Sequence, residues 1–191
     1  MNIRDTYKNL YADIRKKKYF IVFTVSIFFL AATVSVVNSP EMSRILLAVV
    51  DAIRHMSQDY HNRALLYVIA NIFAHNAIAS FIALFSGALF FFIPISMVIV
   101  NGYLIGFVVI PRLSEVGLLI PHGVFELPAF ALACSYGIWL GLWPFNRGGI
   151  ETVKLRLTQC ISIYFCIVVP LLIIAATIEG ALFKYMLKHS Q

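Results

Sequence analysis

The chain has 191 residues, of which 61% are hydrophobic and 13% are charged, and its mean hydropathy is +0.87. One soluble core cannot bury so much apolar surface, so we expect lipid to cover it, and the composition indicates an integral membrane protein. The formal net charge of +6 does not indicate a nucleic-acid partner, because the cations stand in short clusters beside apolar segments, the pattern that sets membrane topology.

The N-terminal region divides into a polar and an apolar segment. Residues 1–18 are basic and carry six cations, namely Arg4, Lys8, Arg15, Lys16, Lys17 and Lys18. Residues 19–38 are apolar for long enough to span a bilayer, and longer than the apolar core of a cleaved signal peptide. The sequence therefore predicts a cytoplasmic N-terminus at 1–18 and a first transmembrane helix at 19–38.

Residues 39–63 are predicted to form an amphipathic helix outside the membrane. Ser39 suits a helix cap, Pro40 suits the first helical position, and Glu41 favours the positive end of the helix dipole. Apolar residues then recur at helical spacing, with polar residues around the rest of the wheel. We interpret the helix as lying on the membrane interface, and docking to a partner is the alternative.

Residues 64–191 are predicted to form a core of four spans, at about 65–93, 95–110, 121–143 and 158–178, followed by a short external tail. This gives an all-α, polytopic membrane protein with five transmembrane helices, placed in the plasma membrane. Nine Lys and Arg residues then fall on the cytoplasmic side, six before the first span and three between the fourth and fifth, against six outside. We expect a kink or a re-entrant turn at Pro128, because proline removes a helix hydrogen bond.

Polar residues within these spans are the predicted functional feature, since such groups usually face a protein interior, a partner or a water-filled cavity. If a helix begins at Pro121, His122 and Glu126 fall on one face at i and i+4. The complete predicted cluster comprises Asn71, His75, Asn76, Asn101, His122 and Glu126. Close helix approach is predicted at small residues, namely Gly87, Gly102, Gly106, Gly123 and Gly137.

A weak internal repeat relates the second and fourth spans. A shift of 50 residues aligns Asn76, Ala79, Ala83, Gly87 and Pro94 with Glu126, Ala129, Ala133, Gly137 and Pro144. If the repeat is real, spans 2–3 and 4–5 are parallel copies. Asn76 and Glu126 would then be equivalent points that face a common centre.

These residues resemble the stage II sporulation protein M family over about 64–142. The resemblance is carried by Asn76, Gly87, Asn101-Gly102, Gly106, Pro121-His122-Gly123, Glu126, Ala133 and Gly137, in this order. It implies an integral membrane protein. The family's namesake is implied to belong to a peptidoglycan-remodelling complex that drives engulfment during endospore formation, with hydrolysis done by its partners.

Three functions remain open at this point. The first is a non-enzymatic membrane scaffold, a homo-oligomer or a component that recruits membrane or cell-envelope proteins. The second is a transporter or channel subunit whose path is lined by the polar cluster. The third is an intramembrane metal site or metalloenzyme, in which His75, His122 and Glu126 hold a divalent ion such as zinc. The sequence favours the scaffold, because a buried His and Glu can satisfy each other without a metal.

Overall fold

The computed structural model describes residues 3–35, 44, 47–48, 60, 63–109, 120–145 and 149–189. These residues form helices and short turns, with no strand among them. In chain order the elements are α1 (Ile3–Lys16), α2 (Lys18–Val34), α4 (Leu65–Phe85), the 3-10 turn η1 (Ser86–Ala88), α5 (Phe92–Val109), α6 (Ile120–Gly141), the 3-10 turn η3 (Trp143–Phe145), α7 (Gly149–Ile163), the π-helical turn η4 (Tyr164–Val168) and α8 (Val169–His189).

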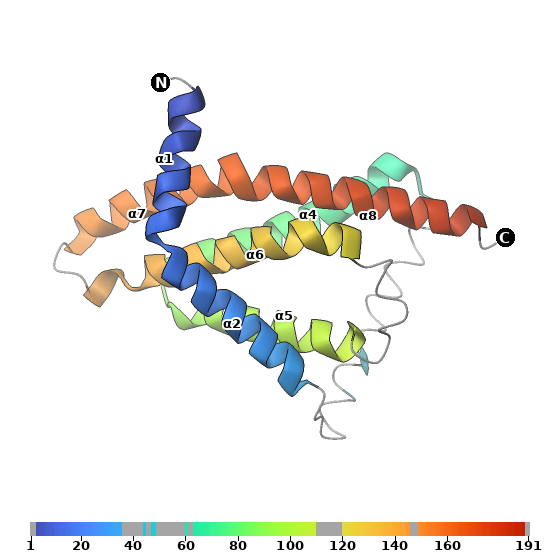
Figure 1. The fold of residues 1–191 in the computed structure, drawn as a ribbon, viewed down its shortest axis with the longest axis horizontal. Coiled ribbons are helices and arrows are strands. Elements are labelled where there is room, and N and C mark those ends of the chain that lie inside the picture. The colour runs from blue at the N-terminus through green and yellow to red at the C-terminus, as the bar shows by residue number, and fades with distance from the viewer. Residues whose placement is uncertain are drawn as a thin grey trace.

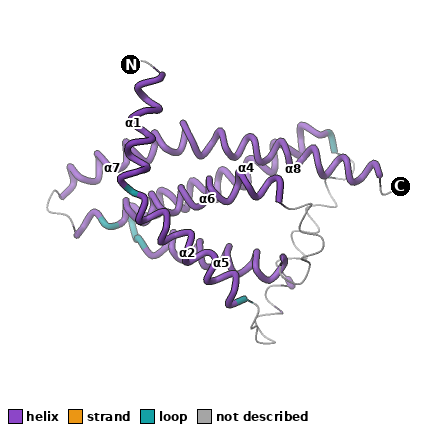
Figure 2. Tube along the Cα trace, viewed as in Figure 1, coloured by secondary structure: helices purple, strands orange, loops and turns teal. Residues whose placement is uncertain are grey.

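The helices form a bundle in which helices that follow one another in the chain, from α2 onward, run in alternating directions (Figures 1 and 2). Helices α2, α5 and the continuous rod α7–η4–α8 run toward the end that carries the C-terminus, whereas α4 and α6 run the other way. Helix α6 is central, because it packs against α2, α4, α5 and α8. Helix α1 differs from the rest, since it lies across the bundle beside α7.

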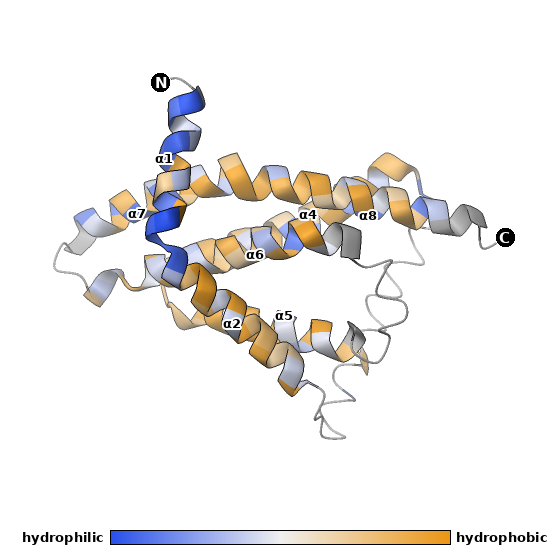
Figure 3. Ribbon diagram, viewed as in Figure 1, coloured by the Kyte–Doolittle hydropathy of each residue, from blue (hydrophilic) through white to orange (hydrophobic). Residues whose placement is uncertain are grey.

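Three helices are long and apolar enough to cross a membrane, at Leu65–Ala88, Gly123–Gly141 and Glu151–Tyr185. A fourth span is present if α1 and α2, which meet at an angle of 63°, are counted as one broken span. The apolar part of α5 is shorter, at Phe92–Phe107. Figure 3 shows apolar residues along the parallel rods and mostly hydrophilic residues on α1. The protein is therefore all-helical and of membrane type, with three to four such helices.

The observed helices differ from the predicted segments in three places. Residues 1–18 are not simply a polar tail, because they contain the amphipathic helix α1. Helix α6 continues through Pro128, so the re-entrant turn that was one of the two expectations there does not occur. Helix α7 begins at Gly149, within the stretch predicted to connect the last two spans. The amphipathic helix predicted at 39–63 falls almost wholly outside the described residues.

Glycines set the spacing between helices. A methyl group added at Gly87 would overlap the backbone carbonyl of Gly137, so α4 and α6 touch at their main chains. Gly141, one turn after Gly137, would place a methyl group 2.6 Å from the Gly87 carbonyl oxygen. Small residues four apart are a common means of close packing between membrane helices. A side chain at any of these positions would push α4 and α6 apart.

Helices α2 and α5 are joined in the same way. An added methyl group at Gly102 would overlap the carbonyl oxygen of Phe28, and one at Gly106 would overlap that of Ala32. Because Gly102 and Gly106 lie four residues apart, they present one smooth face of α5 to α2. The bundle therefore has two glycine-lined seams.

Hydrogen bonds from larger side chains also join the helices. The Tyr164 hydroxyl donates to the carbonyl of Ala77 at 2.8 Å, and the Trp143 indole donates to the carbonyl of Ala88 at 3.1 Å. The hydroxyls of Ser135 in α6 and Thr24 in α2 lie 3.0 Å apart. These bonds link α4, η1 and α2 to elements far along the chain.

Pro170 lies two residues after the end of the π-helical turn η4, in the first turn of α8. Proline has no N–H to donate to the carbonyl of Cys166 four residues earlier, so the regular helix ladder cannot continue there. The Cys166 carbonyl instead accepts a long hydrogen bond, 3.5 Å, from the hydroxyl of Tyr7 in α1. The local defect in the last rod thus provides an acceptor for the N-terminal helix.

We expect Gly87→Ala to destabilise the fold, because the added methyl group meets rigid backbone rather than a movable side chain. Overpacking of this kind costs about 1–3 kcal/mol of unfolding free energy. Gly123→Ala is the matched control, since its methyl group would meet only Leu127 Cδ1 at 4.0 Å. Thermal unfolding in detergent measures both variants. Equal stability of the two would contradict the proposed contact between α4 and α6.

Candidate functional site

A polar cavity of about 130 Å³ lies between α2, α4, α5 and α6. Its walls combine polar and apolar side chains, namely Phe28, His75, Asn76, Ala79, Ser80, Asn101, Ile105, Glu126, Leu127 and Phe130. Asn76 lies near the middle of the Leu65–Ala88 helix, so the cavity is placed within the apolar part of the bundle. A polar cavity of this size has room for water, which needs about 10–15 Å³ per molecule by this measure.

The structure brings four of the six predicted cluster residues to this cavity: His75, Asn76, Asn101 and Glu126. Asn71 is placed elsewhere, and its side-chain amide donates to the carbonyl of Tyr67 in its own helix at 2.9 Å. The side chain of His122 lies outside the described residues. Ser80, which the sequence analysis did not select, also lines the cavity and is buried.

The glycine contact explains why Asn76 and Glu126 meet at one depth. Asn76 precedes Gly87 by eleven residues, and Glu126 precedes Gly137 by the same number. Eleven residues are close to three helical turns, at about 3.6 residues per turn, so each polar residue shares a face with its glycine. Because α4 and α6 run in the same direction, contact at the glycines places Asn76 and Glu126 at equal depth, roughly 16 Å away.

The cavity supplies oxygen acceptors together with amide, imidazole and hydroxyl groups. The Asn101 amide nitrogen donates to the carbonyl of Met97 at 2.8 Å, which leaves the amide oxygen able to accept. Glu126 adds a carboxyl group, and no Lys or Arg is among the lining residues. Chemically, the site therefore suits water, a cation or a hydrogen-bond donor better than an anion.

The predicted metal ligands are only partly placed. His75 and Glu126 line the same cavity, but the third predicted ligand, His122, has its side chain outside the described residues. Among the described side chains, no group of three His, Cys, Asp or Glu residues is arranged to hold a metal ion. The metal site built on His75, His122 and Glu126 therefore stays a prediction.

A second polar cluster, which the sequence analysis missed, joins α1 to the bundle. Lys17, at the bend between α1 and α2, forms a buried ion pair with Asp13 and donates to the side-chain oxygen of Gln159 in α7 at 3.3 Å. Asp13 also accepts a hydrogen bond of 2.6 Å from the hydroxyl of Tyr136 in α6. Four side chains, from three helices and the bend between α1 and α2, thus share one network.

Trp139 completes the cluster as a platform for two cations. The Lys17 ammonium lies 4.0 Å from the centre of the indole ring, and the Arg156 guanidinium lies 4.7 Å from it. Arg156 also donates to the main-chain carbonyl of Trp139. In the sequence both cations served only as markers of the cytoplasmic side. Apart from Asp13, the partners of Lys17 lie more than a hundred residues away in the chain, and the partner of Arg156 lies on another helix.

We expect Asp13→Ala to destabilise the protein strongly, because it leaves the buried Lys17 ammonium without its counter-charge. Breaking a buried pair from one side costs about 3–5 kcal/mol. The control is Glu151→Ala, which removes the exposed pair with Lys154, where the two side chains are 84% and 69% exposed. Exposed pairs contribute about 0–1 kcal/mol. Unfolding free energies in detergent should separate the two variants, and similar values would mean that the Lys17 pair is hydrated.

Comparison with known proteins places the chain in a family. The model of stage II sporulation protein M matches residues 19–182, which include every described helix from α2 to most of α8. No curated protein and no solved structure matched the chain. Because the match covers well over half of the sequence, the chain belongs to the stage II sporulation protein M family.

Proposed function

We propose that the protein is a non-enzymatic membrane scaffold that assembles with copies of itself or with other proteins of the membrane and cell envelope. The glycine seams between α4 and α6 and between α2 and α5 carry this proposal. Main chains in direct contact resist sliding, because any shift forces a carbonyl oxygen against a neighbouring backbone. A bundle held in this way offers a fixed surface to partners.

The proposal includes five spans in the plasma membrane, with the N-terminus in the cytoplasm and the C-terminus outside. The alternating directions of α2, α4, α5, α6 and α7–α8 support it. Helix α5 would then cross as a short span, which a locally thinner bilayer accommodates at modest cost. Six cations near α1 and α2 favour the cytoplasm for that end.

Cysteine accessibility tests this topology. In a background without the native cysteines, we expect Ser57→Cys and Ser190→Cys to react with an impermeant reagent from outside, and Gly149→Cys only after the membrane is opened. Labelling of residue 149 from outside, or protection of residue 190, would overturn the five-span arrangement.

We also propose that spans 2–3 and 4–5 are parallel copies. Two pairs of aligned positions meet in space: Gly87 contacts Gly137, and Asn76 and Glu126 line one cavity. Contact between equivalent positions is what a pseudo-twofold axis between α4 and α6 would produce. Under this arrangement the cavity lies where the two halves meet.

The scaffold proposal is tested by photo-crosslinking in the native membrane. A photoreactive residue in place of Leu66, Val100 or Ile173 samples the exposed faces of α4, α5 and α8. We expect discrete protein adducts from at least one face, with twice the chain mass for a homo-oligomer and another mass for a different partner. Val68, which is fully buried beside the 76%-exposed Leu66, is the control position. Lipid adducts alone at every exposed site would contradict a scaffold.

A second candidate is a transport or channel subunit, favoured by the polar cavity. Oxygen atoms on the wall of a cavity within the membrane, such as those of Asn101 and Glu126, can replace part of the water shell of a small cation, as the walls of selective pores do. The cavity volume of about 130 Å³ suits an ion with water rather than a large solute. Rigid seams are compatible with a channel, because a permanent path needs no sliding of helices.

Flux in liposomes tests this candidate. If the cavity is part of a path, Asn101→Leu should lower the flux of Na⁺, K⁺ or protons while the protein stays folded, because it replaces a polar wall with an apolar one. Asn71→Leu is the matched control, since Asn71 lies on α4 outside the cavity and bonds to its own helix. Absence of flux in the wild type, or an equal loss in both variants, argues against transport through the cavity.

A further inference from the structure

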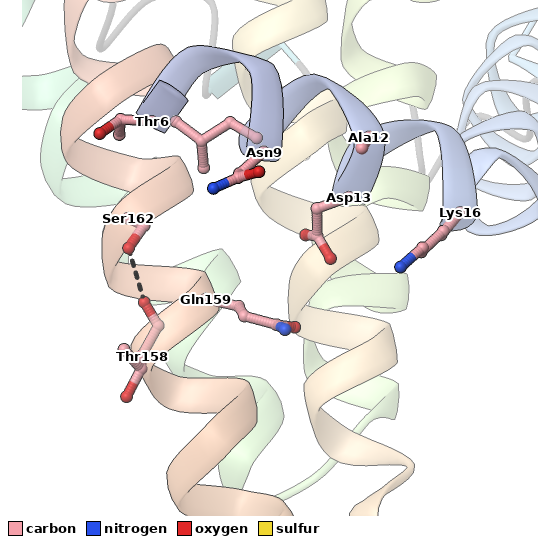
Figure 4. A pocket seen from close by; sticks show the side chains of 9 residues that line it. Thr6, Asn9, Ala12, Asp13, Lys16, Thr158, Gln159 and Ser162 are labelled. Atoms are coloured by element: carbon pink, nitrogen blue, oxygen red, sulfur yellow. Dashed lines mark hydrogen bonds between the residues drawn. The ribbon is translucent and has the colours of Figure 1, made fainter. Parts of the chain in front are cut away.

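A second and larger pocket, of about 350 Å³, lies in the corner between α1 and α7. Figure 4 shows Asn9, Asp13 and Lys16 extending from α1 into this corner, where Gln159 extends from α7. Seven of the nine lining residues have polar side chains, and the complete set is Thr6, Asn9, Leu10, Ala12, Asp13, Lys16, Thr158, Gln159 and Ser162. Neither the polar cavity nor the proposed scaffold function uses it.

The place of the pocket in the fold corresponds to a membrane surface. Helix α1 is amphipathic and lies across the bundle, as interfacial helices do, with Leu10 buried against the core. Tyr7, Tyr11 and Tyr19 are exposed beside the apolar rods, and tyrosine is enriched at the level of lipid headgroups. We therefore expect the pocket to open at the level of the headgroups.

The charges of the pocket favour an anion. Asp13 is already neutralised, because its carboxylate pairs with Lys17 and accepts from Tyr136. Lys16 has an exposed side chain and contributes an unneutralised positive charge to the lining. An ammonium group and a phosphate form a charge-assisted hydrogen bond, which is stronger than a neutral one.

The remaining polar groups suit a ligand that also carries hydroxyls. The Thr158 and Ser162 hydroxyls each donate to a carbonyl of their own helix at 3.0 Å, so their oxygens remain as acceptors. The oxygen of Gln159 accepts from Lys17, so its amide nitrogen remains as a donor. Donors for a phosphate and acceptors for hydroxyl groups thus stand in one pocket.

Apolar side chains next to the pocket suit the tail of a lipid. Ile161 and Phe165 are exposed and flank Ser162 on the same rod, and Phe165 lies two turns after Thr158 on nearly the same face. A soluble ligand would gain no binding free energy from Ile161 and Phe165, whereas an acyl chain would bury apolar surface against both side chains.

We propose that the corner between α1 and α7 binds the phosphate and glycerol of an anionic phospholipid headgroup. Lys16 and Gln159 hold the phosphate, Thr158 and Ser162 accept from the glycerol hydroxyls, and the tails lie along Ile161 and Phe165. The bound lipid ties α1 to α7 and fixes the protein at one leaflet. This site does not depend on the scaffold or transport functions.

Native mass spectrometry of the whole chain, delipidated in detergent and titrated with phosphatidylglycerol, tests the proposal. We expect one tightly held lipid, with phosphatidylcholine held at least tenfold more weakly, because it lacks the hydroxyls and the net negative charge. Lys16→Ala should weaken phosphatidylglycerol binding at least tenfold, and Ser162→Ala by about two- to tenfold, the effect of a typical hydrogen bond. Thermal unfolding of both variants serves as the control for the fold and should be unchanged. If Lys16→Ala lowers the unfolding temperature, Lys16→Gln is used in its place.

The matched control is Lys8→Ala, which removes the same charge from the same helix outside the pocket and should stay within twofold of wild type. Equal losses in Lys8→Ala and Lys16→Ala would mean diffuse attraction to surface charge and would overturn the site. The same holds if Ser162→Ala binds like wild type. A soluble competitor, glycerol 1-phosphate, tests the lipid assignment. If its affinity for the pocket equals that of phosphatidylglycerol, the pocket takes a soluble phosphate ester and the lipid assignment is overturned.

Discussion

Main-chain contact between Gly87 and Gly137 is the constraint on which the rest of the bundle depends. It fixes the spacing and the register of α4 and α6 at once, because only one relative position lets the two backbones meet without overlap. With that register set, Asn76 and Glu126 come to the same depth, and the cavity forms beside them. Residues that never touch the glycines are therefore positioned by them.

Most of the polar residues that line the cavity could be predicted from the sequence. Polar groups within apolar spans are expensive in lipid, so Asn76, Asn101 and Glu126 are expected to face the interior. Asn71 shows the limit of this rule, because a bond to the carbonyl of Tyr67 satisfies its amide without an interior position. Ser80 shows a second limit of the rule. A single serine beside an alanine in an apolar helix does not stand out in the sequence, yet the structure places Ser80 on the cavity wall.

Close helix approach was foreseeable at Gly87, Gly102, Gly106 and Gly137, but the partner of each glycine was not, and at Gly123 an added methyl group would meet only Leu127 of the same helix. Small residues indicate that another helix can approach closely. Which backbone segment lies opposite each glycine depends on which helices are neighbours in the fold. Gly102 meets Phe28, some seventy residues earlier in the chain. The network of Lys17, Asp13 and Trp139 escaped prediction for the same reason, because a lysine in a basic run looks like any other topology signal until an aromatic platform from α6 is placed beneath it.

The glycine seam between α4 and α6 and the polar contacts of α1 differ in the free energy that is needed to separate them. Separating α4 from α6 forfeits close dispersion contacts along the whole seam and would expose Asn76 and Glu126 to lipid. Lifting α1 instead breaks polar contacts at Lys17 and Tyr136, and water can replace these because α1 is already hydrophilic on its outer face. The loss is smaller than that of removing one ion-pair partner, since both charges regain hydration together. Rearrangement is thus cheapest at the bend between α1 and α2, while the bundle around the cavity keeps its shape.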